Sequence, residues 1–235
     1  MGMAGITNAN VSTLAVVGAA SPSGRNAIVD WVFVELRSSA SPTTVVDSRS
    51  ALVQRDGDIV DVDGVSPVTF NSVVSGSFYV AVKHRNHLGV MTAAPIALTT
   101  VTKVVDFRKV STPTYNLNVA SPLNIPQVTV EQGVAMWAGN ALFTNTLDGK
   151  TEVIFQGTDN DVNVIYQQVL NSPANTFGSP SYKLKGYYVG DINMNGETIF
   201  QGTGNDAEFI YQNVLKNHVG NTFGLPNFKI REQLP

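Results

Sequence analysis

Apolar and polar residues alternate along the first half of the chain with the period of two that β-strands require. Residues 27–37 carry apolar side chains on both alternating sets, which is typical of a strand at the centre of a packed sheet. Shorter segments of the same character follow at residues 43–54, 58–63, 67–70, 77–85, 89–98 and 103–107. Asp56-Gly57 between two of them supplies the backbone freedom that a tight hairpin turn needs. The pattern predicts an antiparallel β-sandwich, immunoglobulin-like or transthyretin-like, over residues 1–112.

The period changes after a proline-containing stretch. Residues 113–135 hold three prolines and no strong periodicity, which predicts a linker or an extended segment laid across a domain face. Beyond them, apolar residues recur at helical spacing in two places. They are Val162, Ile165, Tyr166, Val169 and Leu170 in one segment, and Ile210, Tyr211, Val214 and Leu215 in the other. Each set predicts an amphipathic helix within a third region, residues 136–235.

The two helical segments belong to a tandem repeat. Residues 154–170 match residues 199–215 at an offset of 45, and residues 175–183 match residues 221–229 at an offset of 46. A duplication of this length indicates a repeated structural unit. Because each helix has one apolar stripe, we expect the two stripes to be buried against each other.

Composition narrows the classes of function. Only 14% of the residues are charged, the net charge is −3, and there is no cysteine. These values give no electrostatic case for nucleic acid or an anionic membrane, and they exclude disulfides and thiolate chemistry. No apolar run approaches the ~20 residues of a membrane span. The first 24 residues lack the basic region of a signal peptide, so we expect the chain to begin within a longer protein.

The segment that precedes the second helix has the spacing of a calcium loop. Asp191, Asn193 and Asn195 alternate and a glycine follows, so three side-chain oxygens can face a hard cation. The Glu197 carbonyl stands where an EF-hand uses a backbone oxygen, but the twelfth position, which holds the closing acid of an EF-hand, is a glycine. A short polar excursion would then postpone this acid to Asp206. The alternative is an Asx-turn followed by a helix N-cap.

Four motifs give this region a family resemblance. They are Met-Trp-Ala-Gly-Asn at residues 136–140, Gly-Asp-Ile-Asn-Met-Asn-Gly at 190–196, Phe-Gln-Gly-Thr-Gly-Asn-Asp at 200–206 and Leu-Pro-Asn-Phe-Lys-Ile-Arg-Glu-Gln-Leu-Pro at 225–235. The region resembles the dockerin-type calcium-binding repeats at the C-terminal ends of large secreted surface proteins of Bacteroidota. Residues 26–37, 56–70 and 79–92 resemble the β module that precedes such repeats.

The resemblance implies a ligand set for calcium in the second loop: Asp191, Asn193, Asn195, the backbone of Glu197, and Asp206, with Asn205 as a further candidate. With only two carboxylates, the expected dissociation constant is roughly micromolar to millimolar. The first loop departs from the family pattern, because its glycine and phenylalanine are 16 positions apart (139 to 155) against 10 in the second loop (190 to 200). Its candidate ligands are Asn140, in place of an aspartate, with Thr146, Asp148 and Asp161. We expect that site to be weak, remodelled or empty.

Two histidines and one aspartate in the first half could suggest chemistry. His84 and His87 flank an expected hairpin bend, which predicts exposed turn histidines rather than a metal pair. Asp30 lies within an apolar strand, and we expect it to be a structural aspartate bonded to a neighbouring loop or arginine.

Three ring-bearing residues have structural interpretations as well. Trp31 is a predicted core residue, and Trp137 is expected to pack the repeat region against the sandwich or the linker. His218 follows a helix end, where a cation suits the helix dipole.

The sequence thus predicts a mainly β protein in which an antiparallel sandwich precedes a small, dockerin-like α domain. The expected function is that of a non-catalytic, secreted or cell-surface module, stabilised by Ca²⁺, which mediates attachment or assembly through a protein partner or further copies of itself. The competing hypothesis is a carbohydrate-binding adhesin module whose sandwich binds a glycan. No Ser/His/Asp ordering, phosphate loop or nucleotide fingerprint favours an enzyme. Neither nucleic acid nor membrane insertion is expected.

Overall fold

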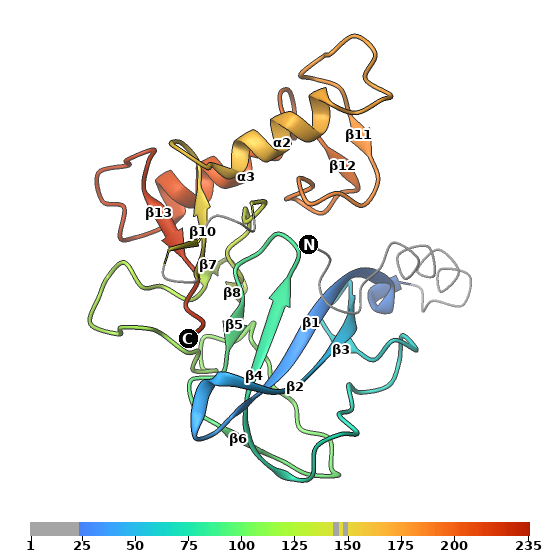
Figure 1. The fold of residues 1–235 in the computed structure, drawn as a ribbon, viewed down its shortest axis with the longest axis vertical. Coiled ribbons are helices and arrows are strands. Elements are labelled where there is room, and N and C mark those ends of the chain that lie inside the picture. The colour runs from blue at the N-terminus through green and yellow to red at the C-terminus, as the bar shows by residue number, and fades with distance from the viewer. Residues whose placement is uncertain (1–23, 143–145, 148–149) are drawn as a thin grey trace. The chain divides into compact units, whose positions relative to one another are not determined.

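The computed structural model describes residues 24–142, 146–147 and 150–235 (Figure 1). It is mainly β, with short helices and antiparallel strand pairs, which confirms that part of the predicted fold class. The chain divides into two compact units. The first contains Met1–Arg85 and Met91–Val105, and the second contains Asn86–Val90 and Asp106–Pro235.

The first unit is built on a six-stranded sheet, coloured blue to green in Figure 1. The strands follow the order β3-β2-β1-β4-β5, and β6 pairs with β4. Their bounds are Ile28–Ser38 for β1, Ser41–Gln54 for β2, Ile59–Val60 for β3, Gly76–His84 for β4, Val90–Met91 for β5 and Ile96–Leu98 for β6. A short 3-10 helix, η1, precedes them at Gly24–Asn26.

β1 occupies the centre of this sheet, as its two apolar faces predict. It pairs with β2 on one side and β4 on the other, and most of its residues are buried. Trp31 is 7% exposed and forms a cluster with Leu52 and Val60, which confirms its core position. The β2–β3 hairpin turns at Asp56-Gly57, where the φ of 89° at Gly57 suits a residue without Cβ.

Two predicted strands are not present. Residues 67–70 form only an isolated bridge between Pro67 and Val60, since a proline has no N–H to extend a ladder. Residues 103–107 end instead in a turn, where the Thr112 hydroxyl donates to the Asp106 carbonyl (2.6 Å). Alternation alone therefore overstated the strand content at these places.

The prediction of exposed histidines around residues 84–87 is wrong. His84 is 6% exposed and its Nε2 lies 3.2 Å from a carboxylate oxygen of Asp30. The Arg85 guanidinium contacts the same oxygen (3.1 Å), so Asp30 is a structural aspartate, as predicted, but its arginine is Arg85. His87 is half-buried, and its ring contacts Asn86 (2.8 Å). Cross-strand partners, which the sequence does not display, account for this burial.

The second unit contains the duplicated segment, coloured green-yellow to red in Figure 1. Its helices are α2 (Asp161–Leu170), α3 (Ala207–Gln212) and the π-helix η2 (Asn213–Asn217). Its strands are β7 (Val128–Val130), β8 (Gly133–Ala135), β9 (Thr146–Leu147), β10 (Lys150–Ile154), β11 (Leu184–Lys185), β12 (Glu197–Thr198) and β13 (Lys229–Arg231). We call residues 136–185 repeat 1 and residues 187–234 repeat 2.

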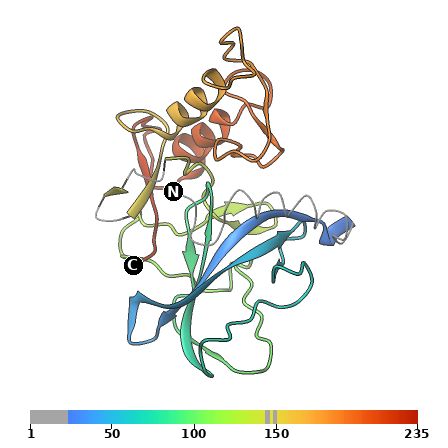
Figure 2. The same ribbon diagram turned by 45° about the vertical axis from the view of Figure 1, so that its right-hand side comes forward.

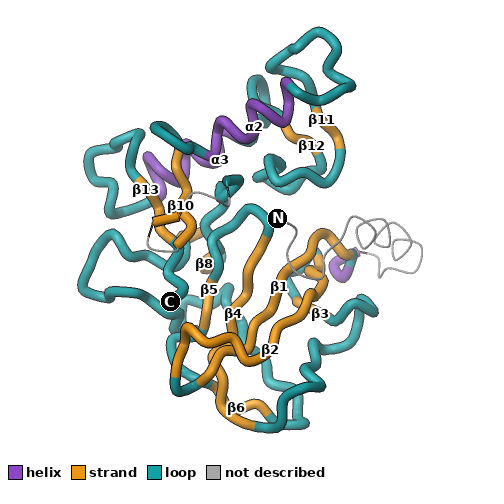
Figure 3. The backbone as a smooth tube through the Cα atoms, viewed as in Figure 1, coloured by secondary structure: helices purple, strands orange, loops and turns teal. Residues whose placement is uncertain are grey.

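The two repeats are interleaved. The strand before each helix pairs with the strand after the other helix: β10 of repeat 1 with β13 of repeat 2, and β12 of repeat 2 with β11 of repeat 1. In Figure 3 these two strand pairs lie at opposite ends of the helix pair. The reciprocity gives the unit an approximate two-fold symmetry that the offset of 45 residues does not by itself reveal.

Aromatic contacts follow the same reciprocity. Phe155 of repeat 1 packs edge-on against Tyr211 of repeat 2, with ring centroids 5.3 Å apart. Phe200 of repeat 2 packs edge-on against Tyr166 of repeat 1 at 4.8 Å. Each such pair stabilises the fold by about 0.5–1.5 kcal/mol beyond the contribution of its buried area.

The helices α2 and α3 lie side by side, as Figures 1 and 2 both show. Their apolar stripes are buried in one core, which confirms the expected burial of one stripe against the other. The fully buried members are Ile165 and Val169 of α2, Ile210 of α3 and Val214 of η2. The interleaved repeats thus fold as one hydrophobic unit, because neither helix could bury its stripe alone.

The second helix ends in a π-turn where the first does not. The His218 N–H donates to the Asn213 carbonyl, five residues back, whereas the Asn171 N–H donates to the Gln167 carbonyl, four residues back. The repeat offset grows from 45 to 46 residues just after this point. A π-turn accommodates one inserted residue within a helix, so we attribute the π-helix to that insertion.

Residues 113–135, predicted as a linker, lie within the second unit. Trp137 is 1% exposed and donates from Nε1 to the Ile125 carbonyl (2.8 Å). Its ring stacks on His218 with centroids 5.1 Å apart. Burial lowers the pKa of His218 to about 4, so the interpretation of His218 as a cation at a helix end is wrong.

Candidate metal centre

The second loop is organised around Asp191, which is 3% exposed. One carboxylate oxygen accepts the Asn195 N–H (3.0 Å) and the other accepts the Gly196 N–H (3.0 Å). Gly196 has a φ of 85°, the left-handed conformation in which glycine carries no Cβ penalty. The loop therefore curls around the first predicted ligand.

The two predicted asparagines stabilise the same curl. The Asn193 carboxamide oxygen accepts the Asn195 N–H (3.0 Å), and the Asn195 oxygen accepts the Glu197 N–H (2.9 Å). Asn193 also donates from Nδ2 to the Gly204 carbonyl (3.2 Å), which ties the excursion back to the loop. Both side chains thus form Asx-turns, which was the competing interpretation of this segment.

Asp206 binds to the loop from the start of the second helix. It is completely buried, and one of its oxygens accepts the N–H groups of Ile192 (2.8 Å) and Asn193 (3.1 Å). Its other oxygen accepts the Ile199 N–H (2.8 Å). Burial, and to a smaller extent the negative charge of Asp191, raises the pKa of Asp206 to about 6. The structure thus brings Asp191 and Asp206 close enough for their charges to interact.

Two other predicted ligands are used differently. Asn205 bonds to the start of the second helix: its side-chain oxygen accepts the Glu208 N–H (2.9 Å) and its Nδ2 donates to the Gly202 carbonyl (2.7 Å). The Glu197 carboxylate pairs with Lys183 (3.2 Å) and Lys185 (3.6 Å), and the Lys183 hydrogen bond lowers its pKa. Only its backbone carbonyl is left for the role that was predicted.

The first loop reproduces the buried carboxylate. Asp161 is completely buried and accepts the N–H groups of Leu142 (2.8 Å) and Ile154 (2.7 Å), the equivalents of Asn193 and Ile199. Burial raises the pKa of Asp161 to about 7. The acid at the start of each helix therefore holds the ends of its loop together, a role that sequence reasoning did not assign.

The remaining first-loop candidates are only partly described. Asn140 is 3% exposed, and its side-chain oxygen has no hydrogen-bond partner in the described part of the chain. Thr146 belongs to β9, and nothing is described of its side chain, while Asp148 lies outside the described residues. A buried oxygen that lacks a donor is costly, and a cation is one way to satisfy it.

Asn86 connects the two loops and was missed by the sequence reasoning. Its carbonyl accepts the N–H groups of Gly139 (2.9 Å) and Asn140 (3.0 Å) in the first loop. Its Nδ2 donates to the carbonyls of Val189 (3.0 Å) and Asp191 (2.7 Å) in the second. The residue is fully buried, so these bonds fix the start of both loops. A single asparagine in a hairpin carries no sequence signal for such a role.

The oxygen atoms of the second loop are of the kinds that a hard cation such as calcium binds. Across residues 24–142, 146–147 and 150–235 there is no group of three His, Cys, Asp or Glu side chains that could hold a metal. Calcium also takes carboxamide and backbone oxygens, and each oxygen has two lone pairs. The side-chain oxygens of Asn193 and Asn195 accept one N–H each, which leaves each of them a second lone pair. The second loop can therefore offer oxygens to calcium without losing its internal bonds.

Comparison with protein-family models, curated proteins and solved structures gave no match for the chain. Within the described residues, no helix has the length and apolar character needed to cross a membrane. The function is therefore inferred from the geometry of the loops and helices.

Proposed function

We propose that the second unit is a calcium-stabilised module of the dockerin type and that the first is an immunoglobulin-like or transthyretin-like β-sandwich. The proposal for the second unit is supported by its duplicated loop–helix segments and their interleaved strands. The proposal for the first unit is supported by its antiparallel sheet, whose central strand β1 is buried along most of its length.

The proposed calcium site lies in the second loop. Its ligands are the carboxylates of Asp191 and Asp206, the side-chain oxygens of Asn193 and Asn195, and the Glu197 carbonyl. The observation that carries the proposal is the burial of two carboxylates whose charges interact: Asp191 is 3% exposed and Asp206 is fully buried. A divalent cation would neutralise both, whereas without one the pair is costly to bury.

The proposed role is interaction rather than catalysis, in a secreted or cell-surface protein. It is supported by two phenylalanines at equivalent positions, Phe177 (96% exposed) and Phe223 (87% exposed). Each is two residues after a buried asparagine, Asn175 or Asn221, which bonds backbone groups on both sides of its turn. Large apolar side chains on such fixed turns are suited to contact with another protein.

Calorimetry of the full chain with excess calcium, with excess magnesium and with a chelator tests the calcium proposal. Calcium should raise the melting temperature of one transition, and Asp191→Asn should reduce that rise.

Sedimentation of the wild type and of Phe177→Ala/Phe223→Ala over a wide concentration range tests the interaction role. Concentration-dependent association that the double substitution weakens supports self-assembly; an unchanged monomer in both leaves only a foreign partner.

A further inference from the structure

The two ends of the helix pair are equivalent in the repeat but are covered differently. Trp137 precedes the first loop in Trp-Ala-Gly-Asn, and Tyr188 precedes the second in Tyr-Val-Gly-Asp. Three residues after the last leucine of each helical segment stand Pro173 in repeat 1 and His218 in repeat 2. Because the repeats are interleaved, Trp137 lies against His218, and Tyr188 lies beside Pro173.

At the His218 end, the chain covers the site with its own residues 117–125. Trp137 donates to the Ile125 carbonyl (2.8 Å), and the Leu117 N–H donates to the side-chain oxygen of Gln233 (3.2 Å). A Cβ on Gly220 would lie 2.7 Å from the Pro122 carbonyl oxygen, so the segment passes very close to the turn after the helix. Trp137 and His218 are consequently almost fully buried.

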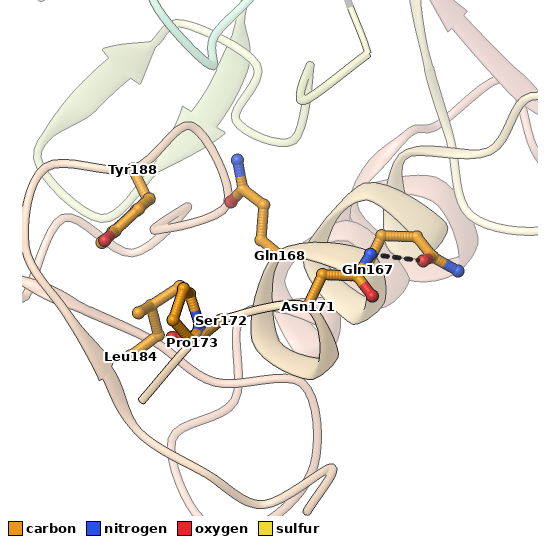
Figure 4. Close-up of a pocket in the computed structure, with 7 residues that line it drawn as sticks. All are labelled: Gln167, Gln168, Asn171, Ser172, Pro173, Leu184 and Tyr188. Atoms are coloured by element: carbon orange, nitrogen blue, oxygen red, sulfur yellow. Dashed lines mark hydrogen bonds between the residues drawn. The ribbon is translucent and has the colours of Figure 1, made fainter. Parts of the chain in front are cut away.

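At the Tyr188 end, the equivalent position is an open groove of about 410 Å³. It is lined by Gln167, Gln168, Asn171, Ser172, Pro173, Leu184 and Tyr188 (Figure 4). Tyr188 is 37% exposed, against 1% for its counterpart Trp137. We call this the Tyr188 groove. The difference lies in what covers the site, since the helix and loop that build it are repeated.

The lining matches the chemistry of a neutral peptide backbone. None of its side chains is charged, and residues 111–130, which include the segment on the other end, also contain no Asp, Glu, Lys or Arg. The Asn171 side chain donates one hydrogen bond to the Gln167 side chain (2.9 Å). An amide N–H of each residue and the Asn171 oxygen remain to bond the backbone of an extended ligand peptide, which has no internal hydrogen bonds of its own. Extended proline-containing segments also favour aromatic-lined grooves, because little conformational entropy is lost on binding.

We propose that the Tyr188 groove binds an extended, uncharged, proline-containing segment of a separate protein, as the other end of the helix pair binds residues 117–125 of its own chain. This inference rests on the proposed interaction role and specifies its partner. It does not depend on calcium.

The probe is a fluorescein-labelled peptide with the sequence of residues 114–126, titrated with the full chain and followed by anisotropy. We expect saturable binding that Tyr188→Ala weakens by about tenfold or more, the loss typical of an aromatic anchor. Tyr187→Ala is the matched control, because Tyr187 is 40% exposed but does not line the groove. A peptide with both prolines, Pro122 and Pro126, replaced by aspartate should not bind.

Absence of saturation up to about 1 mM protein overturns the inference. Equal binding by Tyr188→Ala and wild type also overturns it. Self-association that Tyr188→Ala abolishes overturns it as well, because a second copy would then be the occupant. Each titration is repeated with a chelator. Peptide binding without any calcium effect on melting would refute the calcium proposal alone. A calcium effect on melting without peptide binding would refute the proposal for the Tyr188 groove alone.

Discussion

The two loops of the repeat share the same backbone framework but differ in the residue at their first position. In each, a buried aspartate at the helix start, Asp161 or Asp206, accepts backbone N–H groups from both ends of its loop. At the first loop position, Asp191 in one stands against Asn140 in the other. The helix-start acid thus stabilises the fold in both loops, whereas the charge that the first position would offer to a cation is present only in the second loop.

The largest effect is expected from removing the helix-start acids. Asp161→Ala and Asp206→Ala each leave at least two buried or partly buried N–H groups without an acceptor, at about 1–3 kcal/mol per group. We expect both substitutions to destabilise the second unit by about 4 kcal/mol in urea titrations followed by circular dichroism. Calcium should still stabilise Asp161→Ala, but not Asp206→Ala. A mild effect of either substitution would refute the shared framework.

The next effect concerns the close approach of each loop to the other repeat's helix. A Cβ on Gly139, where φ is +124°, would lie 2.8 Å from Val153 Cγ1 and 3.0 Å from Ile210 Cγ1. Gly139→Ala should therefore cost about 3 kcal/mol from overpacking and backbone strain together. Gly157→Ala is the control, because Gly157 has a φ of +127° with no atom within 4 Å of its Cβ position. If thermal denaturation shows that Gly139→Ala and Gly157→Ala lower the melting temperature equally, backbone strain and not the interleaved packing determines the cost.

His218 makes the covered end of the helix pair sensitive to acid. Burial lowers its pKa to about 4, so between this value and the ordinary pKa near 6.5 the unfolded chain binds more protons than the folded one. The stabilisation is complete above pH 6.5 and decreases as the pH falls toward 4, by on the order of 2 kcal/mol. His218→Phe keeps an aromatic ring against Trp137 without a titrating group. Urea titrations at several pH values should show a weaker acid dependence in this variant; parallel curves would contradict the assignment.

The smallest effect comes from exchanging the residues at the first loop position. Asp191→Asn should weaken calcium binding about tenfold, which is about 1.4 kcal/mol, because ligand charge sets affinity. Asn140→Asp should strengthen binding in the first loop and increase the number of ions bound per chain. Isothermal titration calorimetry measures both. If Asn140→Asp binds no more calcium than wild type, the charge at this position is not what separates the two loops.

Local sequence patterns predicted the helices and the repeat, because an apolar stripe such as Ile165 and Val169 depends on neighbours within one segment. The same patterns predicted Asp191, Asn193 and Asp206 close to one another, and the structure places them so. The interleaving of β10 with β13, the burial of His84 against Asp30 and the bonds of Asn86 to both loops depend on residues far apart in the chain. A single sequence carries no periodic signal for such contacts. The equivalence of Trp137 and Tyr188 was visible in the repeat, but their different coverage was not.

Calorimetric melting of the full chain with calcium and with chelator is the decisive test of a calcium site in the second loop. With free calcium at about 100 times the dissociation constant, the bound ion should stabilise the second unit by about 2.7 kcal/mol. This corresponds to a rise in melting temperature of roughly 5–10 °C for a unit of this size. Asp191→Asn should shift that response to higher calcium concentrations. Identical melting with calcium and with chelator, in the wild type at calcium concentrations up to tens of millimolar, would contradict the account.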